Sequence, residues 1–296
     1  NYSEEGIYSE TTIYANNLMN YGSKVTYGNN SVSGWTLQDD EVIEDDLYIM
    51  GGIMDLNGHT LMVNGNLIFG EGTLKMNGGE LKVSGDFRLQ GMIKSGESVS
   101  YTTSNGVLEM TEDKDSITVE KDFIIQTNGN HTEKLTAGTI VLKGNLYQYE
   151  ANGIFAGTQS HTIVLSGNHE QTINFAKTAN NGNRIANLVV KNTSTGKVKF
   201  VNQLYVSGTV KDESENIAGT GSIIIDQFTQ LENNKYSGSV VLTGNTKCEK
   251  DFVIGGTLTI KNNFDVNGQV LKVKNLSITN GDFKVNTGHV QCSGNM

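Results

Sequence analysis

A 20-residue unit occurs twice in succession within residues 46–90, and it limits the possible folds more than any other feature of this sequence. A fixed period of this length is typical of solenoids, propellers and other repeat architectures. Apolar positions and turn residues recur at the same offset, which makes a chance match improbable. The equivalent positions are Leu47, Leu67 and Phe87, then Leu61 and Leu81, then Val63 and Val83, and the turn pairs Asn57-Gly58 and Asn77-Gly78.

Each unit holds three short runs in which apolar and polar residues alternate, as they do in β-strands. In the first unit these runs are residues 53–57, 60–64 and 66–69. The Asn-Gly pairs are common turns of antiparallel hairpins. In an up-and-down sheet, however, an odd number of strands per unit would reverse the direction of equivalent strands in successive units. A coil with one triangular turn per unit has no such conflict.

We therefore predict an all-β fold, a single-stranded right-handed parallel β-helix (β-solenoid) with about 20 residues and three short strands per turn. Stacked strands set the rise at about 4.8 Å per turn. The handedness is assigned from the length of the turn, because left-handed coils usually keep a stricter six-residue step, and from the resemblance given below.

The complete absence of proline agrees with this coil. Interior strands are paired on both sides, so a proline would delete a ladder hydrogen bond and force a bulge. The chain is also rich in asparagine and contains 35 glycines. Asparagine tolerates left-handed backbone conformations at corners, and stacked asparagines can form hydrogen-bonded ladders. We expect such ladders along the coil axis.

The chain is expected to hold an N-terminal cap or irregular first turn over residues 1–34 and a β-solenoid over 35–296. The solenoid is predicted to be regular at 46–90 and 250–296 and interrupted by loops at 150–245. Polar insertions at 176–184 and 211–218 are the predicted loops. No window shows an apolar stripe with helical period, so very little helix is expected.

Later segments repeat the same pattern. Residues 119–126 and 142–149 resemble the corner and strand at 83–90, and residues 262–275 are repeated at 281–294. The sequence stops where the next strand should begin. This predicts that the repeat continues in a longer chain beyond Met296.

The two cysteines, Cys248 and Cys292, are predicted to occupy the inward position of Val83, with Val273 at the same place in the turn between them. Two turns correspond to about 9–10 Å, which is too far for a disulfide. Free, buried thiols are expected, and a bridge is the alternative that a secreted protein would favour.

An acidic run between residues 39 and 46 offers a possible calcium site. Carboxylates near one corner could supply the six to eight oxygen ligands that Ca²⁺ prefers. The candidates are Asp39, Asp40, Asp45 and Asp46. Their spacing matches neither an EF-hand nor the known calcium-binding β-helix repeat. A solvated acidic loop is the plainer interpretation, and no other cofactor is expected.

Two further acidic groups could serve a glycoside hydrolase, which needs two carboxylates facing each other across about 5–10 Å. They are Asp113 with Asp115, and Asp212 with Glu213 and Glu215. Both lie in polar stretches whose loop character explains them, so no catalytic residue is assigned and enzymatic activity is not expected.

Histidines and aromatic residues give weaker signals. The five histidines form no metal-binding motif and are expected to be exposed; they are His59, His131, His161, His169 and His289. A second set could form a sugar-stacking surface or, more simply, an aromatic cap; it comprises Tyr8, Tyr14, Tyr21, Tyr27 and Trp35.

The net charge of −10 and the lack of basic patches argue against nucleic acid as a partner. No stretch approaches 18 apolar residues, so no membrane-spanning segment is expected. Residues 1–10 are polar and acidic, unlike a signal peptide, and the sequence is expected to begin inside a longer or processed chain.

Four segments, residues 35–90, 135–148, 155–175 and 187–200, resemble repeats in large surface proteins of Gram-positive bacteria. Such proteins are similar to filamentous-haemagglutinin-type adhesins in their expected right-handed β-helix. The resemblance covers roughly residues 35–210. It implies secretion, an extracellular or cell-surface location and a stalk or adhesive role, and it supplies no catalytic motif.

Three functional hypotheses follow. The first is a non-catalytic structural or adhesive stalk module whose loops contact a host or environmental surface glycan or protein. The second is a carbohydrate-binding or carbohydrate-cleaving β-helix, which a groove lined by paired carboxylates or aromatic residues would favour. The third is an oligomeric fibre segment, which an exposed apolar stripe would favour.

Overall fold

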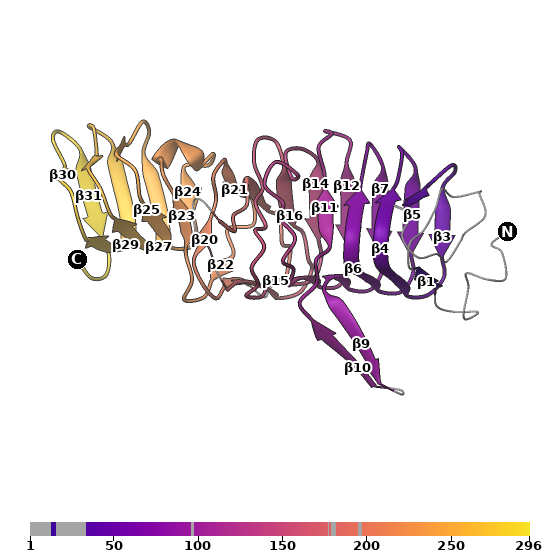
Figure 1. The fold of residues 1–296 in the computed structure, drawn as a ribbon. Coiled ribbons are helices and arrows are strands. Elements are labelled where there is room, and N and C mark those ends of the chain that lie inside the picture. The colour runs from indigo at the N-terminus through magenta and orange to yellow at the C-terminus, as the bar shows by residue number, and fades with distance from the viewer. Residues whose placement is uncertain (1–12, 16–33, 96–97, 177, 179–181, 195–196) are drawn as a thin grey trace. The chain divides into compact units, whose positions relative to one another are not determined.

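The computed structural model describes residues 13–15, 34–95, 98–176, 178, 182–194 and 197–296, and almost every regular element in them is a β-strand (Figure 1). The chain forms two compact units, residues 1–163 and 164–296. The sequence predicted no boundary at this point. The predicted cap lies outside the described residues, except for residues 13–15 and Gly34.

The first unit is built from strands that are mostly three to five residues long. They are β1 (Ile13–Ala15), β2 (Gly34–Thr36), β3 (Glu41–Ile43), β4 (Leu47–Asp55), β5 (Thr60–Val63), β6 (Leu67–Lys75), β7 (Glu80–Val83), β8 (Phe87–Leu89), β9 (Gly91–Ser95), β10 (Ser98–Thr102), β11 (Val107–Glu109), β12 (Ser116–Val119), β13 (Phe123–Ile125), β14 (Thr139–Leu142) and β15 (Leu146–Gln148). Strand β16 (Thr162–Leu165) spans the boundary between the units.

Two parallel sheets line the first unit, one in the order β1-β4-β6-β8-β13-β15 and the other in the order β3-β5-β7-β12-β14. Leu47 pairs with Leu67 and Leu67 pairs with Phe87, so one turn takes 20 residues. Leu61 pairs with Leu81 in the second sheet. The predicted β-solenoid and its repeat length are therefore confirmed, whereas the right-handedness stays a prediction.

The division of each turn into three short strands is only partly correct. Two of the predicted runs join into one nine-residue strand, β4 in one turn and β6 in the next, and the pairing register shifts in the middle of both. Gly52 and Gly72 have positive φ angles of 78° and 87° at this bend. A Cβ on Gly72 would lie 1.9 Å from the Gly52 carbonyl oxygen, so the chain turns here without breaking the strand.

The Asn-Gly pairs form corners between the two sheets, as the coil requires, and do not form hairpins. Asn57 and Asn77 have φ angles of 49° and 45°, and each is followed by a glycine with positive φ. The expected left-handed asparagine corners are confirmed at these positions. They recur in the second unit at Asn267 and Asn286, with φ angles of 54° and 48°.

The later copies of the pattern are confirmed too. Val119 pairs with Val83 on one side and with Leu142 on the other, as the similarity of these segments predicts. Phe123 pairs with Phe87 across a turn of 36 residues, because β9 and β10 are inserted there as an antiparallel hairpin (Figure 1). The sequence analysis did not predict this insertion.

The second unit has shorter turns. Its elements are β17 (Gln171–Phe175), β18 (Asn187–Val190), β19 (Val198–Phe200), β20 (Leu204–Tyr205), β21 (Val210–Asp212), β22 (Ile217–Ala218), β23 (Ile223–Ile225), the 3-10 helix η1 (Phe228–Gln230), β24 (Lys235–Tyr236), β25 (Val240–Leu242), β26 (Thr246–Lys247), β27 (Phe252–Ile260), β28 (Phe264–Asp265), β29 (Val270–Ile278), β30 (Phe283–Lys284) and β31 (His289–Cys292).

Parallel pairing also organises this unit, in the orders β17-β19-β22, β18-β21, β20-β23-β25-β27-β29-β31 and β26-β28-β30. Val240 pairs with Leu258 and Leu258 with Leu276, so these turns take 18 residues. The predicted loop at 211–218 is wrong in part: β21 and β22 occupy its ends, and only the residues between them form a corner. The insertion at 176–184 lies partly outside the described residues.

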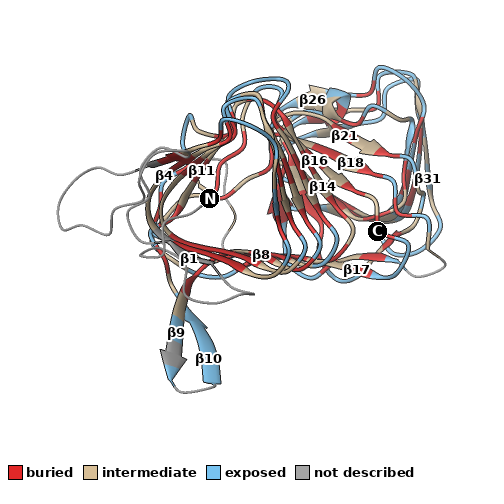
Figure 2. Cartoon of the chain, turned by 90° about the vertical axis from the view of Figure 1, so that its right-hand side faces the viewer, coloured by how far each residue is buried: buried red, intermediate tan, exposed pale blue. Residues whose placement is uncertain are grey.

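The core of each unit is a stack of apolar side chains, one layer per turn. Buried and half-buried positions alternate along β5, β7, β12 and β14, and Figure 2 shows the buried residues on the inner side of the coil. Phe87 and Phe123 stack with ring centroids 4.9 Å apart, and Phe155 meets Phe123 edge-on at 6.1 Å. Each turn therefore depends on its neighbours for burial.

Both cysteines are free thiols, as predicted. Cys248 is buried, and burial raises the pKa of its thiol to about 12. Cys292 pairs with Val273 as expected but is half-buried, because β31 is the outermost strand of its sheet. The predicted column for Cys248 is wrong: Lys247 pairs with Asp265 in a different sheet, so the likeness to 82–87 reflects a shared corner sequence.

Candidate functional site

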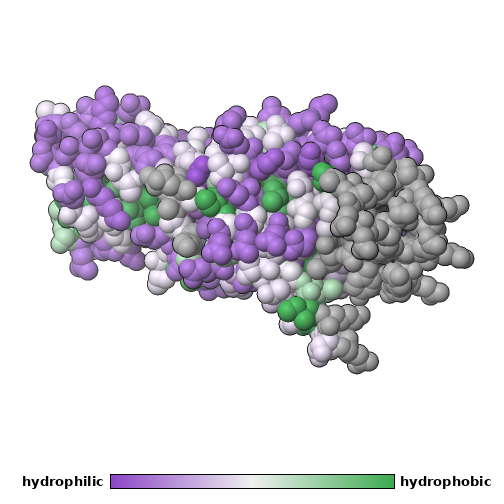
Figure 3. Space-filling view, viewed as in Figure 1, coloured by the Kyte–Doolittle hydropathy of each residue, from purple (hydrophilic) through white to green (hydrophobic). Residues whose placement is uncertain are grey.

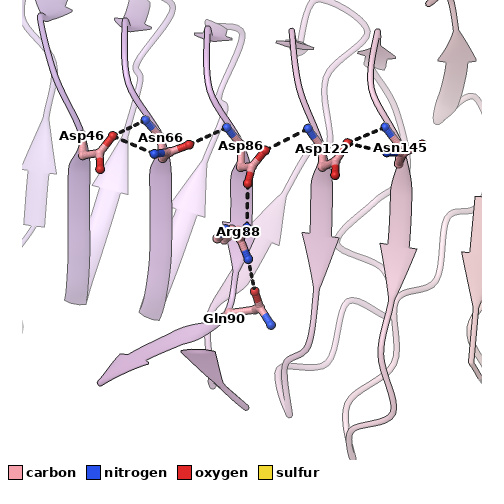
Figure 4. A network of polar contacts seen from close by, with 7 residues as sticks. All are labelled: Asp46, Asn66, Asp86, Arg88, Gln90, Asp122 and Asn145. Carbon is pink, nitrogen blue, oxygen red and sulfur yellow. Dashed lines mark hydrogen bonds and ion pairs between the residues drawn. The ribbon is translucent and has the colours of Figure 1, made fainter. Parts of the chain in front are cut away.

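A ladder of side chains runs along one corner of the first unit, where five strands of successive turns begin (Figure 4). Asp46 Oδ1 accepts hydrogen bonds from the backbone and side-chain nitrogens of Asn66 at 2.6 and 2.9 Å. Asn66 Oδ1 accepts from Asp86 N at 2.8 Å, and Asp86 Oδ1 accepts from Asp122 N at 3.1 Å. Asp122 Oδ1 accepts from both nitrogens of Asn145. The expected ladder is present, with aspartates among the asparagines.

One arginine partly neutralises this ladder. Arg88 Nη2 lies 2.6 Å from Asp86 Oδ2, and its Nη1 donates to Gln90 Oε1 at 3.0 Å (Figure 4). Its guanidinium also lies over the ring of Tyr101, 4.1 Å from the centroid. This cation–π contact joins the corner ladder to the inserted hairpin.

The calcium candidates lie at the two ends of β3. Asp40 Oδ1 accepts from Thr60 N at 2.8 Å, and Asp45 Oδ1 accepts from Asp46 N at 2.9 Å. Asp46 belongs to the ladder, while Asp39 is exposed. Among the described residues, no group of three or more His, Cys, Asp or Glu side chains is placed to hold a metal ion. The calcium site stays a prediction.

The first pair of candidate catalytic carboxylates supports a corner. Asp115 is buried and accepts hydrogen bonds from Thr111 N, Glu112 N and Gly78 N at 2.7, 3.0 and 2.7 Å. Asp113 is exposed beside it. Three backbone donors on one carboxylate satisfy amides that a corner leaves unpaired, which is a structural use of the acid.

The second acidic group is arranged in the same way. Asp212 is buried, and its Oδ2 accepts from the backbone nitrogen and hydroxyl of Ser237 at 3.1 and 2.6 Å. Glu213 forms an ion pair with Lys211 at 2.7 Å, and Glu215 pairs with a lysine of β24. Each acid is therefore held by a neighbouring donor.

The prediction that all histidines are exposed is wrong for two of them. His131 and His161 are buried, while His59 is half-buried and His169 and His289 are exposed. Both buried rings belong to the first unit, where they fill the interior next to corners. The polar neighbours of these histidines in the sequence gave no sign of this, because corner residues can turn either inward or outward.

His131 has a defined tautomer in the core. Leu108 N donates to its Nε2 at 3.1 Å, so Nδ1 carries the proton and donates to the Ile154 carbonyl at 3.1 Å. Burial lowers the pKa of His131 to about 4, and burial together with the nearby His131 lowers that of His161 to about 4. These imidazoles are neutral core groups at pH 7.

The aromatic set does not form a visible sugar-stacking surface. Trp35 is buried in the first unit. The side chains of Tyr8, Tyr14, Tyr21 and Tyr27 lie outside the described residues.

A groove on the second unit is the best-formed binding surface there. It has a volume of about 500 Å³ and crosses four successive turns at the bend of β27 and β29. Small residues form its floor, and exposed lysines stand at its ends: Ala218, Gly219, Ser237, Gly238, Ser239, Gly255, Gly256 and Thr257, with Lys197 and Lys274. The groove was not predicted in detail, although the glycine pair at 255–256 marks its centre.

Hydrogen bonds between turns fix the polar floor of the groove. Ser239 Oγ accepts from Thr257 N at 3.0 Å, and Asn275 Nδ2 donates to Thr257 Oγ1 at 3.3 Å. Among the described residues that line it, Glu215 is the only carboxylate and none is aromatic. The groove therefore offers hydroxyl, amide and ammonium groups to a ligand and lacks a facing pair of acids.

Comparison of the chain with protein-family models finds no match, and comparisons with curated proteins and with solved structures find none that is significant. Among the residues that the structure describes, no helix is long and apolar enough to cross a lipid bilayer.

Proposed function

We propose that this chain is a non-catalytic structural and adhesive module of a secreted or cell-surface bacterial protein. The observation that carries the proposal is the corner ladder from Asp46 to Asn145, which uses carboxylates and amides to join each turn to the next. The other candidate acids, Asp115 and Asp212, also bind backbone donors. Side chains suited to chemistry are thus committed to holding the coil together.

The mechanism of such a module is geometric. Parallel strands are stitched to their neighbours by backbone ladders, and the side-chain ladder adds bonds along the same direction. A stack of this kind resists bending and extension because many hydrogen bonds must break together. The exposed corners and loops are then available to contact a surface glycan or protein.

Binding and turnover measurements on the folded chain test this proposal. The chain would be applied to arrays of glycans and surface proteins, with calcium or with EDTA, while polysaccharide solutions are monitored for new reducing ends or unsaturated products. We expect retention on a subset of ligands without product release. Sustained product release would contradict the non-catalytic assignment, and binding only with calcium would revive the site near Asp39, Asp40, Asp45 and Asp46.

The groove of the second unit supports a narrower candidate, a carbohydrate-binding β-helix. Its length across four turns and its polar floor suit an extended polymer, and the lysines at its ends favour an acidic one. The variant Lys274→Glu should weaken binding of acidic polysaccharides. Lys272→Glu is the matched control, because Lys272 is equally exposed on β29 but does not line the groove. Equal effects of both variants would count against the groove.

A further inference from the structure

The β9–β10 hairpin leaves the coil of the first unit and projects from it (Figure 1). In Figure 3, hydrophobic surface is visible on this hairpin. Three of its apolar side chains are open to solvent: Ile93 is 55% exposed, Val99 is 43% exposed and Tyr101 is 38% exposed. Every residue of β10 is exposed, so this strand has an interaction surface that the rest of the unit does not cover.

The edge of β10 is open to pairing. Among the described strands, β10 pairs only with β9, whereas the central strands of the coil, such as β5 and β7, are paired on both sides. Natural proteins protect an open edge with a charged residue, a proline or a bulge. Strand β9 carries Lys94, but β10 has the sequence Ser-Val-Ser-Tyr-Thr and carries no such residue.

We propose that β10 is the self-association site of this protein, pairing in antiparallel fashion with β10 of a second copy. The strand is self-complementary about Ser100. In this register Ser100 faces its own counterpart, Val99 faces Tyr101 of the other copy, and Ser98 faces Thr102. Pairs of an aromatic with a β-branched residue, and of Ser with Thr, are favourable neighbours across strands.

Charge favours this occupant. Each chain carries a net charge of −10, so two copies repel each other at most points of contact. An uncharged strand held away from the body lets two copies meet where that repulsion is least. The Arg88 guanidinium over the Tyr101 ring, 4.1 Å from its centroid, fixes the base of the hairpin and places a cation close to the junction.

The symmetry of the pairing limits its product. Because the same strand is used by both copies, the interface is isologous and closes at a dimer. Pairing through β10 forms a four-stranded sheet in the order β9-β10-β10-β9. The two copies of Ile93 lie on one face of that sheet, since Ile93 is paired with Ser100 within the hairpin.

Sedimentation equilibrium of the full chain, from about 10 µM to about 1 mM, measures the association. We expect a monomer–dimer equilibrium that Val99→Lys weakens at least about tenfold. Val42→Lys is the matched control, because Val42 is 50% exposed on the coil itself. A chain that stays monomeric throughout this range, or a dimer weakened equally by both variants, would overturn the proposal.

Cysteine cross-linking provides a second readout that does not depend on affinity. In a Cys292→Ser background, Ser100→Cys should form a disulfide-linked dimer under mild oxidation, because the two sulfurs meet on the two-fold axis. Val42→Cys in the same background should cross-link much more slowly. Circular dichroism confirms that each variant is folded. Equal rates for the two cysteines would contradict pairing through β10.

Discussion

The first unit carries a ladder of aspartate and asparagine side chains at the corner before β4, β6, β8, β13 and β15, whereas the second unit carries a shorter one before β28 and β30. In the second unit Asn263 N donates to Asn245 Oδ1 at 3.2 Å, and Asp282 N donates to Asn263 Oδ1 at 2.8 Å. Both bonds are exposed, whereas those of the first ladder are partly buried. The same corner device therefore contributes more where water is excluded.

The interiors of the two units differ as well. The first unit buries His131 and His161, while the histidines of the second unit, His169 and His289, are exposed. A buried neutral imidazole makes stability depend on pH, and an exposed one does not. The comparison indicates that the two units should respond differently to core truncation, acid and loss of a ladder side chain.

The largest effect is expected from truncating the phenylalanine stack. Phe123→Ala removes a buried ring that contacts Phe87 and Phe155, and it should lower the free energy of unfolding by about 3–5 kcal/mol. Phe283→Ala in the second unit is the control. That ring is only half-buried, so about 1 kcal/mol is expected. Urea unfolding of both variants checks this, and similar losses would show that depth in the stack does not matter.

Acid should destabilise the protein through the first unit. In the folded chain the pKa of His131 and of His161 is about 4, against 6.5 when exposed. Their stabilising contribution is therefore present above pH 6.5 and is lost as the pH falls towards 4, because the unfolded chain binds protons first. The loss should reach about 3 kcal/mol per histidine, and it can be measured by urea unfolding at a series of pH values.

Single variants assign this pH dependence. His131→Gln should remove about half of it, since one of the two buried imidazoles remains. His169→Gln, at an exposed position of the second unit, should leave the pH profile unchanged. An unaltered profile in His131→Gln would contradict the assignment to the buried pair.

Removing a ladder side chain should have an intermediate effect. Asp122→Ala leaves two nitrogens of Asn145 without their acceptor in a partly buried corner, so a loss of about 2 kcal/mol is expected. Asn263→Ala in the exposed ladder of the second unit should cost less than about 1 kcal/mol. Thermal or urea unfolding measures both, and the reverse order would disprove the role of burial.

The smallest effect is expected at the outermost strand. Cys292→Ser should change the free energy of unfolding by less than about 0.5 kcal/mol, because the side chain is half-buried. Labelling with a thiol reagent sharpens this: one thiol should react in the folded protein and two after denaturation. Rapid native labelling in Cys292→Ser would show that Cys248 is not protected.

The sequence indicates most of the first unit, because its corners keep the same residues at a 20-residue spacing. Leu47, Leu67 and Phe87 identify the column of stacked side chains directly. The second unit is harder to predict because its turns vary in length, and Cys248 was placed in the wrong column for that reason.

The functional surface is less predictable than the fold. The hairpin at β9 and β10 looks like any alternating strand in the sequence, and nothing local says that it leaves the coil. His131 and His161 are flanked by polar residues, so their burial depends on which way a corner turns. The acids at Asp115 and Asp212 resemble catalytic candidates until their backbone partners are seen.

Disulfide trapping between turns tests the parallel coil most directly. In a chain whose two native cysteines are replaced by alanine, Met62→Cys with Lys82→Cys should form a disulfide, because these residues are paired in adjacent parallel strands. Thr73→Cys with Lys82→Cys should not, since those positions meet only if Asn77-Gly78 closes an antiparallel hairpin. Cross-linking of the second pair without the first would contradict the solenoid on which the whole account depends.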